Sequence, residues 1–145
     1  MARYDKYDPI SGGFRGVLAA DFALGTPVNG VFPNLGKVYP VSLNSSGLVT
    51  IGAIAANPGM VGVMILTSQK FAGDVVDIMT EGEIVDLNSA SPFDNFAAAP
   101  VAGSKYYGVA ADGTVSATAT SNYFIGHTVE ATRLIVRVGN RAAGA

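Results

Sequence analysis

The 145-residue sequence contains no cysteine, which excludes disulfide bonds and thiolate metal sites. It also lacks a long hydrophobic run, since residues 60–66 fall far short of the roughly 20 apolar residues that cross a bilayer. Only 14% of the residues are charged, and the formal net charge is -2, so there is no general positive field to hold nucleic acid by its phosphates. The first residues carry no apolar segment typical of a secretory signal. We therefore expect a soluble protein with no direct nucleic-acid partner and no membrane partner.

Residues for catalysis are scarce as well. His127 is the only histidine, and without a second nitrogen ligand or any sulfur ligand it does not predict a zinc site. Serine-nucleophile elbows, phosphate-binding glycine loops and dinucleotide-binding motifs are absent from the sequence. We predict no enzyme, no catalytic residues, no cofactor and no metal. The alternative left open is a small β-barrel hydrolase or lyase that uses His127 with a carboxylate.

Residues 1–34 differ from the rest of the chain. Prolines and glycines interrupt the apolar patterns, and aromatic residues recur with neither a helical nor a strand period. This pattern predicts an extended N-terminal arm, within which residues 15–22 could form either one short strand or a helical turn. Disordered segments are usually poor in aromatic residues, because these side chains stabilise a protein where they are buried. We therefore expect the arm to pack on a partner surface. The candidate contact residues are Tyr4, Tyr7, Ile10, Phe14 and Phe22.

Beyond residue 35 the sequence reads as short strands separated by turns. The expected strand segments are 37–43, 48–51, 60–66, 72–79, 84–87, 106–111, 114–120 and a last strand around 129–138. Pro40 cannot donate to a ladder, so its strand is expected to be an edge or to be bulged there. About eight short strands without an amphipathic helix predict an all-β fold, either a small β-barrel or a compressed sandwich, over residues 35–138. Residues 139–145 are expected to form a flexible tail.

The segment 72–87 is the clearest predicted hairpin, with its turn at residues 80–83. Strand alternation places Val76 and Ile78 on the interior face. Asp77, Glu81 and Glu83 are then expected on a rim, in water or paired across a subunit boundary. The acids do not have the spacing of an EF-hand calcium loop. Basic residues near the C-terminus, Arg133 and Arg137 among them, are expected to pair with this acidic segment of the same or a neighbouring chain.

No charged residue lies between Lys37 and Lys70. Two interpretations remain open, because both buried central strands and the core of a subunit interface are depleted of charge. The second interpretation makes Met60, Val63 and Met64 candidates for a trimer interface.

The order of several short motifs resembles that of the capsid cement, or head decoration, proteins of tailed bacteriophages. The motifs are GDVVDIMTEGEIV at 73–85, AGSKYY at 102–107, DG at 112–113, IGHTVE at 125–130 and LIVRV at 134–138. The resemblance covers about residues 36–138. The N-terminal RYDKYDP at 3–9 is similar to the leading arms of actinobacterial phage versions.

This resemblance implies a small β-barrel without catalytic residues that binds the outer surface of the phage head as a homotrimer. Its partner would be the major capsid protein, at positions between capsomers, where it stabilises the head against internal DNA pressure. Such a protein is made in the host cytoplasm and ends in the virion. A phage tail or baseplate structural protein remains the alternative.

Overall fold

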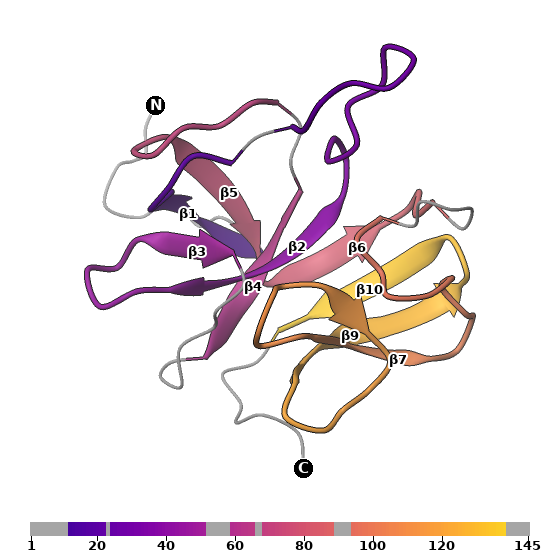
Figure 1. Cartoon of the computed structure of the whole chain (residues 1–145). Helices are drawn as coiled ribbons and strands as arrows, with labels where there is room; N and C mark the ends of the chain where they lie inside the picture. Colours follow the sequence, from indigo (N-terminus) through magenta and orange to yellow (C-terminus); the bar gives the residue numbers. More distant parts are fainter. Residues whose placement is uncertain (1–11, 23, 52–58, 66–67, 89–93, 139–145) are drawn as a thin grey trace, which may run out of the picture.

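The computed structural model describes residues 12–22, 24–51, 59–65, 68–88 and 94–138, and all regular structure in these ranges is β-strand (Figure 1). The strands are β1 (Gly13–Val17), β2 (Val38–Leu43), β3 (Val49–Ile51), β4 (Met60–Ile65), β5 (Val75–Met79), β6 (Glu81–Ile84), β7 (Lys105–Gly108), β8 (Val115–Ser116), β9 (Tyr123–Glu130) and β10 (Arg133–Arg137). The all-β prediction is confirmed, with ten strands instead of about eight. No described segment forms a helix long and apolar enough to span a membrane.

The first sheet has the order β1-β5-β4-β2-β3 and curls into a half-barrel (Figure 1). Its two outer strands approach each other where Leu18 bridges Val49 and the Ala19 N–H donates to the Val49 carbonyl at 2.9 Å. This closure encloses one hydrophobic core, built from Leu18, Tyr39, Val41, Val49, Met64, Val76 and Ile78.

The second sheet, with the order β6-β10-β9-β7-β8, provides half of the buried residues of a second core. Tyr106, Ile125, Leu134 and Val136 contribute from this sheet, whereas Val38, Met60 and Val63 contribute from the half-barrel. Strands β2 and β4 therefore face a different core on each side, which explains why their sequences are almost continuously apolar.

The expected hairpin over residues 72–87 is not formed. Only Thr80 of the predicted turn lies outside a strand, because residues 81–83 belong to β6. β5 pairs with β1 and β4, whereas β6 pairs with β10 in the other sheet. Thr80 connects the two strands: its N–H donates to the Gly12 carbonyl at 2.8 Å, and its carbonyl accepts from the Val138 N–H at 2.8 Å. The prediction that Val76 and Ile78 face inward is confirmed, with exposed fractions of 5% and 2%.

Two other predicted hairpins are present. β2 pairs with β3 around a loop in which the Asn44 side chain accepts from the N–H groups of Ser46 and Leu48, at 2.9 and 3.0 Å. β7 pairs with β8 around the Asp112-Gly113 turn. There the hydroxyl and the N–H of Thr114 both donate to Asp112, which lowers the pKa of this carboxyl group.

One of the two alternatives for the strand of Pro40 is confirmed: β2 lies between β3 and β4 and so is not an edge, but its ladder with β4 shifts register between Val41 and Ser42, close to Pro40. Two details differ from the expectation. The single last strand is a pair of strands, β9 and β10. Gly13–Val17, which was assigned to the arm, forms β1 and belongs to the folded domain. The expected tail lies outside the described residues.

Candidate interaction surfaces

The predicted arm contacts fall into two groups. Tyr4, Tyr7 and Ile10 lie outside the described residues. Phe14 and Phe22 are half-buried and pack against the core of the half-barrel. The Phe22 ring meets the Tyr39 ring edge-on, with centroids 4.8 Å apart and planes at 67°. Phe14 and Phe22 therefore stabilise the domain itself and have little free surface for a capsid contact.

Gly12, the first described residue, is held firmly against the domain. Its carbonyl accepts from the N–H groups of both Thr80 and Glu81, at 2.8 and 3.0 Å. Its φ of +86° favours glycine, and a Cβ atom here would collide with the Glu81 carbonyl oxygen. The connection between residues 1–11 and the domain is thus fixed at the point where β5 passes into β6.

The three predicted trimer-interface residues are inside the molecule. The exposed fractions of Met60, Val63 and Met64 are 3%, 1% and 2% within a single chain. Met60 and Val63 pack in the core between the sheets, and Met64 packs inside the half-barrel. Their side chains have almost no surface left for a partner, so the charge-free segment is accounted for here by burial within one chain.

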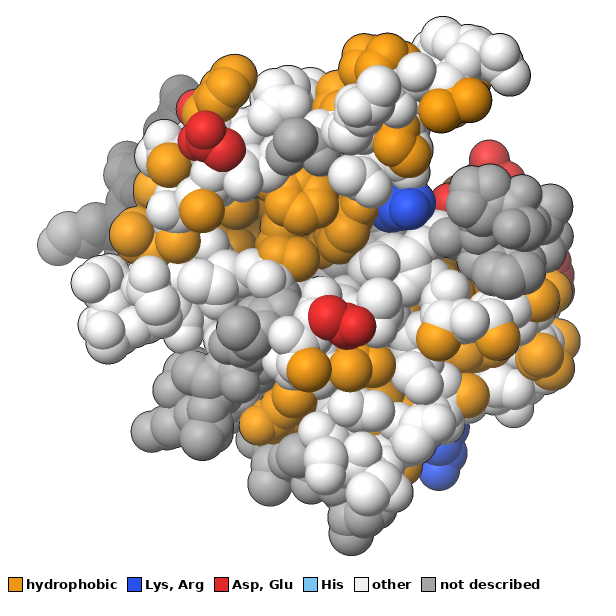
Figure 2. Space-filling view, in the orientation of Figure 1, with side chains coloured by type: hydrophobic (Ala, Val, Ile, Leu, Met, Phe, Trp, Pro, Cys, Tyr) orange, Lys and Arg blue, Asp and Glu red, His pale blue; other side chains and the backbone are white. Residues whose placement is uncertain are grey.

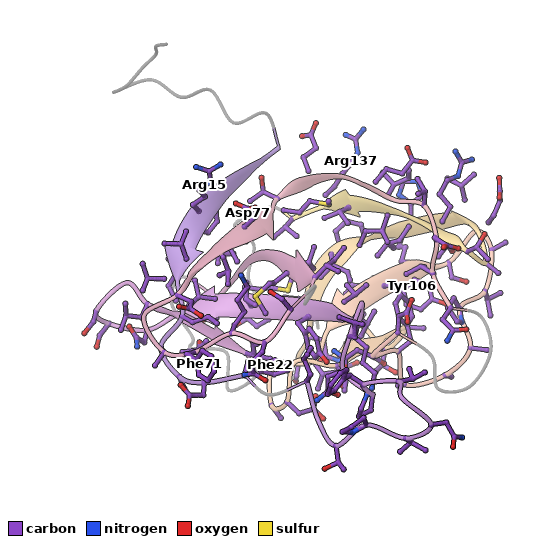
Figure 3. All side chains as sticks on the ribbon, turned by 90° about the horizontal axis from the view of Figure 1, so that it is seen from above. Arg15, Phe22, Phe71, Asp77, Tyr106 and Arg137 are labelled. Carbon is purple, nitrogen blue, oxygen red and sulfur yellow. The ribbon has the colours of Figure 1, made fainter. Side chains whose placement is uncertain are left out.

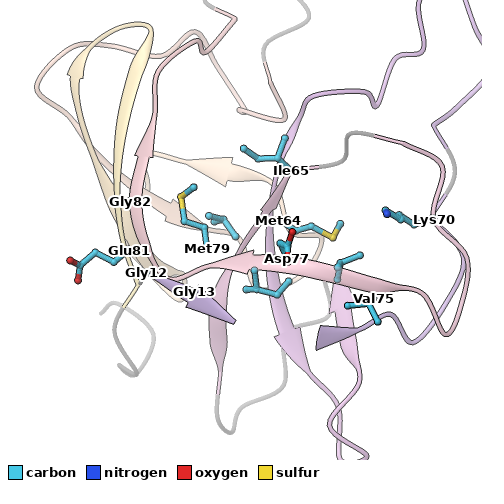
Figure 4. A pocket seen from close by; sticks show the side chains of 13 residues that line it. Gly12, Gly13, Met64, Ile65, Lys70, Val75, Asp77, Met79, Glu81 and Gly82 are labelled. Carbon is cyan, nitrogen blue, oxygen red and sulfur yellow. The ribbon is translucent and has the colours of Figure 1, made fainter. Parts of the chain in front are cut away.

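A groove opens between β4 and β5, with a cavity volume of about 560 Å³ (Figure 4). Among the described residues the two strands pair at Val63↔Met79, and they diverge from there toward Ile65 and Val75. Gly12 and Glu81 lie at one end of the groove and Lys70 lies at the other (Figure 4). The rest of the lining is mostly apolar. Val75, Ile65 and Met79 have exposed or half-buried side chains there, whereas four further lining residues are only 1–5% exposed: Val63, Met64, Val76 and Ile78. We call this feature the β4–β5 groove.

Ion pairs hold the acidic segment of the chain, as the sequence suggested. Arg133 reaches Glu83 at 3.0 Å and Glu130 at 3.2 Å, within one chain. Arg15 reaches Asp77 at 3.2 Å on an open surface, where such a pair contributes at most about 1 kcal/mol (Figure 3). Glu81 is exposed, in line with its predicted place on a rim, and is the register partner of Arg137.

Among the residues that the structure describes, no carboxylate lies opposite His127 in the sheet. His127 is exposed on β9, and its register partners on the two neighbouring strands are Lys105 and Ile135, neither of which is a carboxylate. The described ranges also contain no cluster of three or more histidine, aspartate or glutamate residues that could hold a metal ion.

Sequence reasoning missed one surface entirely. Residues 24–36, which we call the apical loop, project beyond the strands and carry exposed hydrophobic side chains (Figures 1 and 2). The available signal was the absence of charge between Asp21 and Lys37. The segment was instead assigned to the arm because its prolines and glycines interrupt every periodic pattern.

Comparisons with known proteins relate the chain to others through its fold. No protein-family model matches the chain, and no curated protein matches it. A solved structure named Mycobacterium phage Patience contains a similar chain, with a TM-score of 0.66, 24% sequence identity, and coverage of 97% of both chains. At this identity the similarity establishes a shared fold.

Proposed function

We propose that this protein is a bacteriophage capsid decoration protein. It binds the outer surface of the head as a trimer between capsomers of the major capsid protein and stabilises the head against internal DNA pressure. The main support is the match of the whole fold, over 97% of both chains, to a chain in a structure named for a Mycobacterium phage. The order of the motifs between residues 73 and 138 supports the same assignment.

The architecture suits a mechanical role. Two separate hydrophobic cores share β2 and β4, so that a load applied to one sheet is carried directly into the other. The chain also passes between the sheets at Thr80, whose backbone is hydrogen-bonded to Gly12 on one side and Val138 on the other. Such a body can transmit force between the surfaces that it bridges.

The arm that contacts the capsid comprises residues 1–11. It is shorter than the sequence suggested, because residues 13–17 form β1 and Phe22 packs in the half-barrel. Tyr4, Tyr7 and Ile10 remain the candidate contacts. Three arms on one trimer act together, so capsomers separate only if several weak contacts break jointly.

Deleting residues 2–11 tests the proposal without removing a described strand. The truncated protein should unfold at nearly the same denaturant concentration as the full chain, because the β1–β5 ladder remains intact. It should no longer bind heads that lack the protein, as measured by co-sedimentation with purified heads.

Two further variants separate aromatic contact from charge. The double variant Tyr4→Ser, Tyr7→Ser should lose head binding, whereas Asp5→Asn, Asp8→Asn retains both aromatic side chains and should bind as the full chain does. Undiminished binding by the deletion variant would contradict the role of the arm. Binding of the full chain to purified tails and not to heads would instead identify a tail or baseplate protein.

A further inference from the structure

The apical loop has a defined, hydrogen-bonded conformation and an apolar tip. The Val28 N–H donates to the Val31 carbonyl at 2.9 Å, and the Val31 N–H donates to the Val28 carbonyl at 3.0 Å. The two residues between them, Asn29 and Gly30, have φ values of 53° and 77°, which is the asparagine-glycine turn that closes tight hairpins. Val28 and Val31 are consequently presented side by side, with 66% and 65% of their surface exposed.

The base of the apical loop is fixed to the half-barrel. The Asn34 N–H donates to the Leu24 carbonyl at 3.0 Å. The Gln69 side chain accepts from the Leu24 N–H at 3.2 Å and donates to the Phe22 carbonyl at 2.9 Å. A loop tied in this way loses little conformational freedom when it binds, which favours its use as a contact surface.

The exposed surface of this loop is hydrophobic and uncharged. Besides the two valines, Phe32 and Leu35 are 38% and 45% exposed, and no charged residue lies between Asp21 and Lys37. Hydrophobic side chains stand out on the projecting loop (Figure 2). Several large apolar side chains exposed together on one uncharged loop indicate an interaction site, and its partner must offer apolar surface without a charge that would be buried unpaired.

The β4–β5 groove offers such a surface on the same molecule. Its apolar lining includes Val75, which is 57% exposed, and Ile65 and Met79, which are half-buried. Glu81 and Lys70 lie at its ends, whereas Asp77 lies between Val75 and Met79, is 86% exposed and is already paired with Arg15. Because this central charge has a partner, an uncharged apolar tip can dock here without leaving an unpaired charge.

We infer that the apical loop of one copy of this protein docks in the β4–β5 groove of a second copy. The loop does not fill the groove of its own chain, because Val28 and Val31 remain about two-thirds exposed and the loop projects away from the strands (Figure 1). The groove offers such a tip a cavity of about 560 Å³. Each copy carries both halves of the contact, so repeated docking joins identical subunits.

This inference supplies the contact between copies that the proposed trimer needs, and in that respect it rests on the proposed function. Its consequence is that the loop and the groove are buried in the oligomer, while residues 1–11 remain available for the head. Subunit association and head binding therefore depend on different residues and can be disrupted separately.

The test measures the mass of the full chain in solution by sedimentation velocity over a range of concentrations. The wild-type chain should be oligomeric. The loop variant Val28→Asp, Val31→Asp and the groove variant Val75→Asp should each raise the dissociation constant at least tenfold. Val101→Asp is the matched control, because Val101 is 59% exposed but belongs to neither surface, and this variant should associate as the wild type does.

A charge exchange identifies the two surfaces as partners. Val28→Lys alone should weaken association, and the double variant Val28→Lys, Val75→Asp should restore it, because the lysine on each copy then meets the aspartate on the next. All variants change exposed side chains, and circular dichroism verifies that they fold. A monomeric wild type, an unaffected loop or groove variant, or no recovery in the double variant would overturn the inference.

The outcomes also separate this inference from the proposed function. A loop variant that remains oligomeric and still binds heads overturns the inference and leaves the function standing. A wild type that does not bind heads but whose oligomer dissociates in the loop and groove variants removes the function and upholds the inference.

Discussion

Replacing Tyr39 with phenylalanine should flatten the loss of stability above pH 10. Tyr39 is 5% exposed inside the half-barrel, and its hydroxyl lies 3.4 Å from the Asn34 carbonyl oxygen. Burial, reinforced by the negative charge of Asp94, raises the pKa of Tyr39 from 10.0 to about 12. Burial has this effect because the phenolate would lose its hydration without gaining a compensating partner.

The sign and size of the effect follow from the two pKa values. Below pH 10 the phenol is protonated in both the folded and the unfolded state, so its stabilising contribution is fully present. Between pH 10 and 12 the unfolded state releases the proton first, and the free energy of unfolding falls by about 1.4 kcal/mol per pH unit. The contribution is lost as the pH rises through the folded-state value, with a total loss on the order of 2.7 kcal/mol.

The measurement compares urea unfolding of the wild type and Tyr39→Phe at pH 9 and pH 11.5. Other groups also titrate in this window, but they are common to both proteins and cancel in the difference. The wild type should lose about 2 kcal/mol more than the variant between the two pH values. Equal losses in the two proteins would show that Tyr39 ionises as readily in the half-barrel as in water, and would refute the reasoning.

Three substitutions test the packing and the polar connections of the second sheet, each by denaturant unfolding. Phe96→Ala should lower the free energy of unfolding by about 3–5 kcal/mol, because Phe96 is 6% exposed with its ring 5.0 Å from that of Tyr106; a loss below about 1 kcal/mol would contradict this packing. Asn95→Ala should cost about 1–3 kcal/mol, since the Asn95 amide donates to the carbonyls of Val38 and Gly113, both at 2.8 Å, and an unchanged midpoint would show that neither bond matters. Thr128→Val should cost a similar amount, about 1–3 kcal/mol, because the buried Thr128 hydroxyl donates to the Val101 carbonyl and accepts from the Ser104 N–H; a stabilised variant would be the contrary result.

Local signals in the sequence were sufficient for several elements of the fold. Alternation identified Val76 and Ile78 as buried, because a strand that faces a core on one side carries its pattern in its own residues. The loops at Asn44 and Asp112 were identifiable because their side chains form the turn with residues two to four positions away. These interactions are encoded within a few residues of one another.

The partner of a strand was harder to predict, because partner choice depends on distant segments. β5 and β6 are consecutive and were expected to pair, yet β5 pairs with β1 and β6 pairs with β10. The sequence GFRGV of β1 has a weak strand pattern of its own, and the edge of β5 supplies the hydrogen bonds that make it a strand. Such a choice depends on which edge is available in the folded chain.

The role of the charge-free segment could not be decided from composition, for a related reason. Composition alone does not distinguish a strand that is buried within one chain from a strand that is buried between chains, because both are apolar and free of charge. Met60, Val63 and Met64 proved to be buried within one chain. The exposed valines of the apical loop lie in a segment without periodicity, so no sequence pattern indicated which way their side chains face. They are exposed because the turn at Asn29 and Gly30 places them at the tip of the loop.

The central claim is that this protein decorates the outside of a phage head. Electron cryomicroscopy of heads assembled with and without the protein tests it most directly. The account predicts extra density on the outer surface at three-fold and quasi-three-fold positions between capsomers, present when the protein is present and absent when it is not. Identical heads in the two samples, or density that follows the protein to the tail, would contradict it.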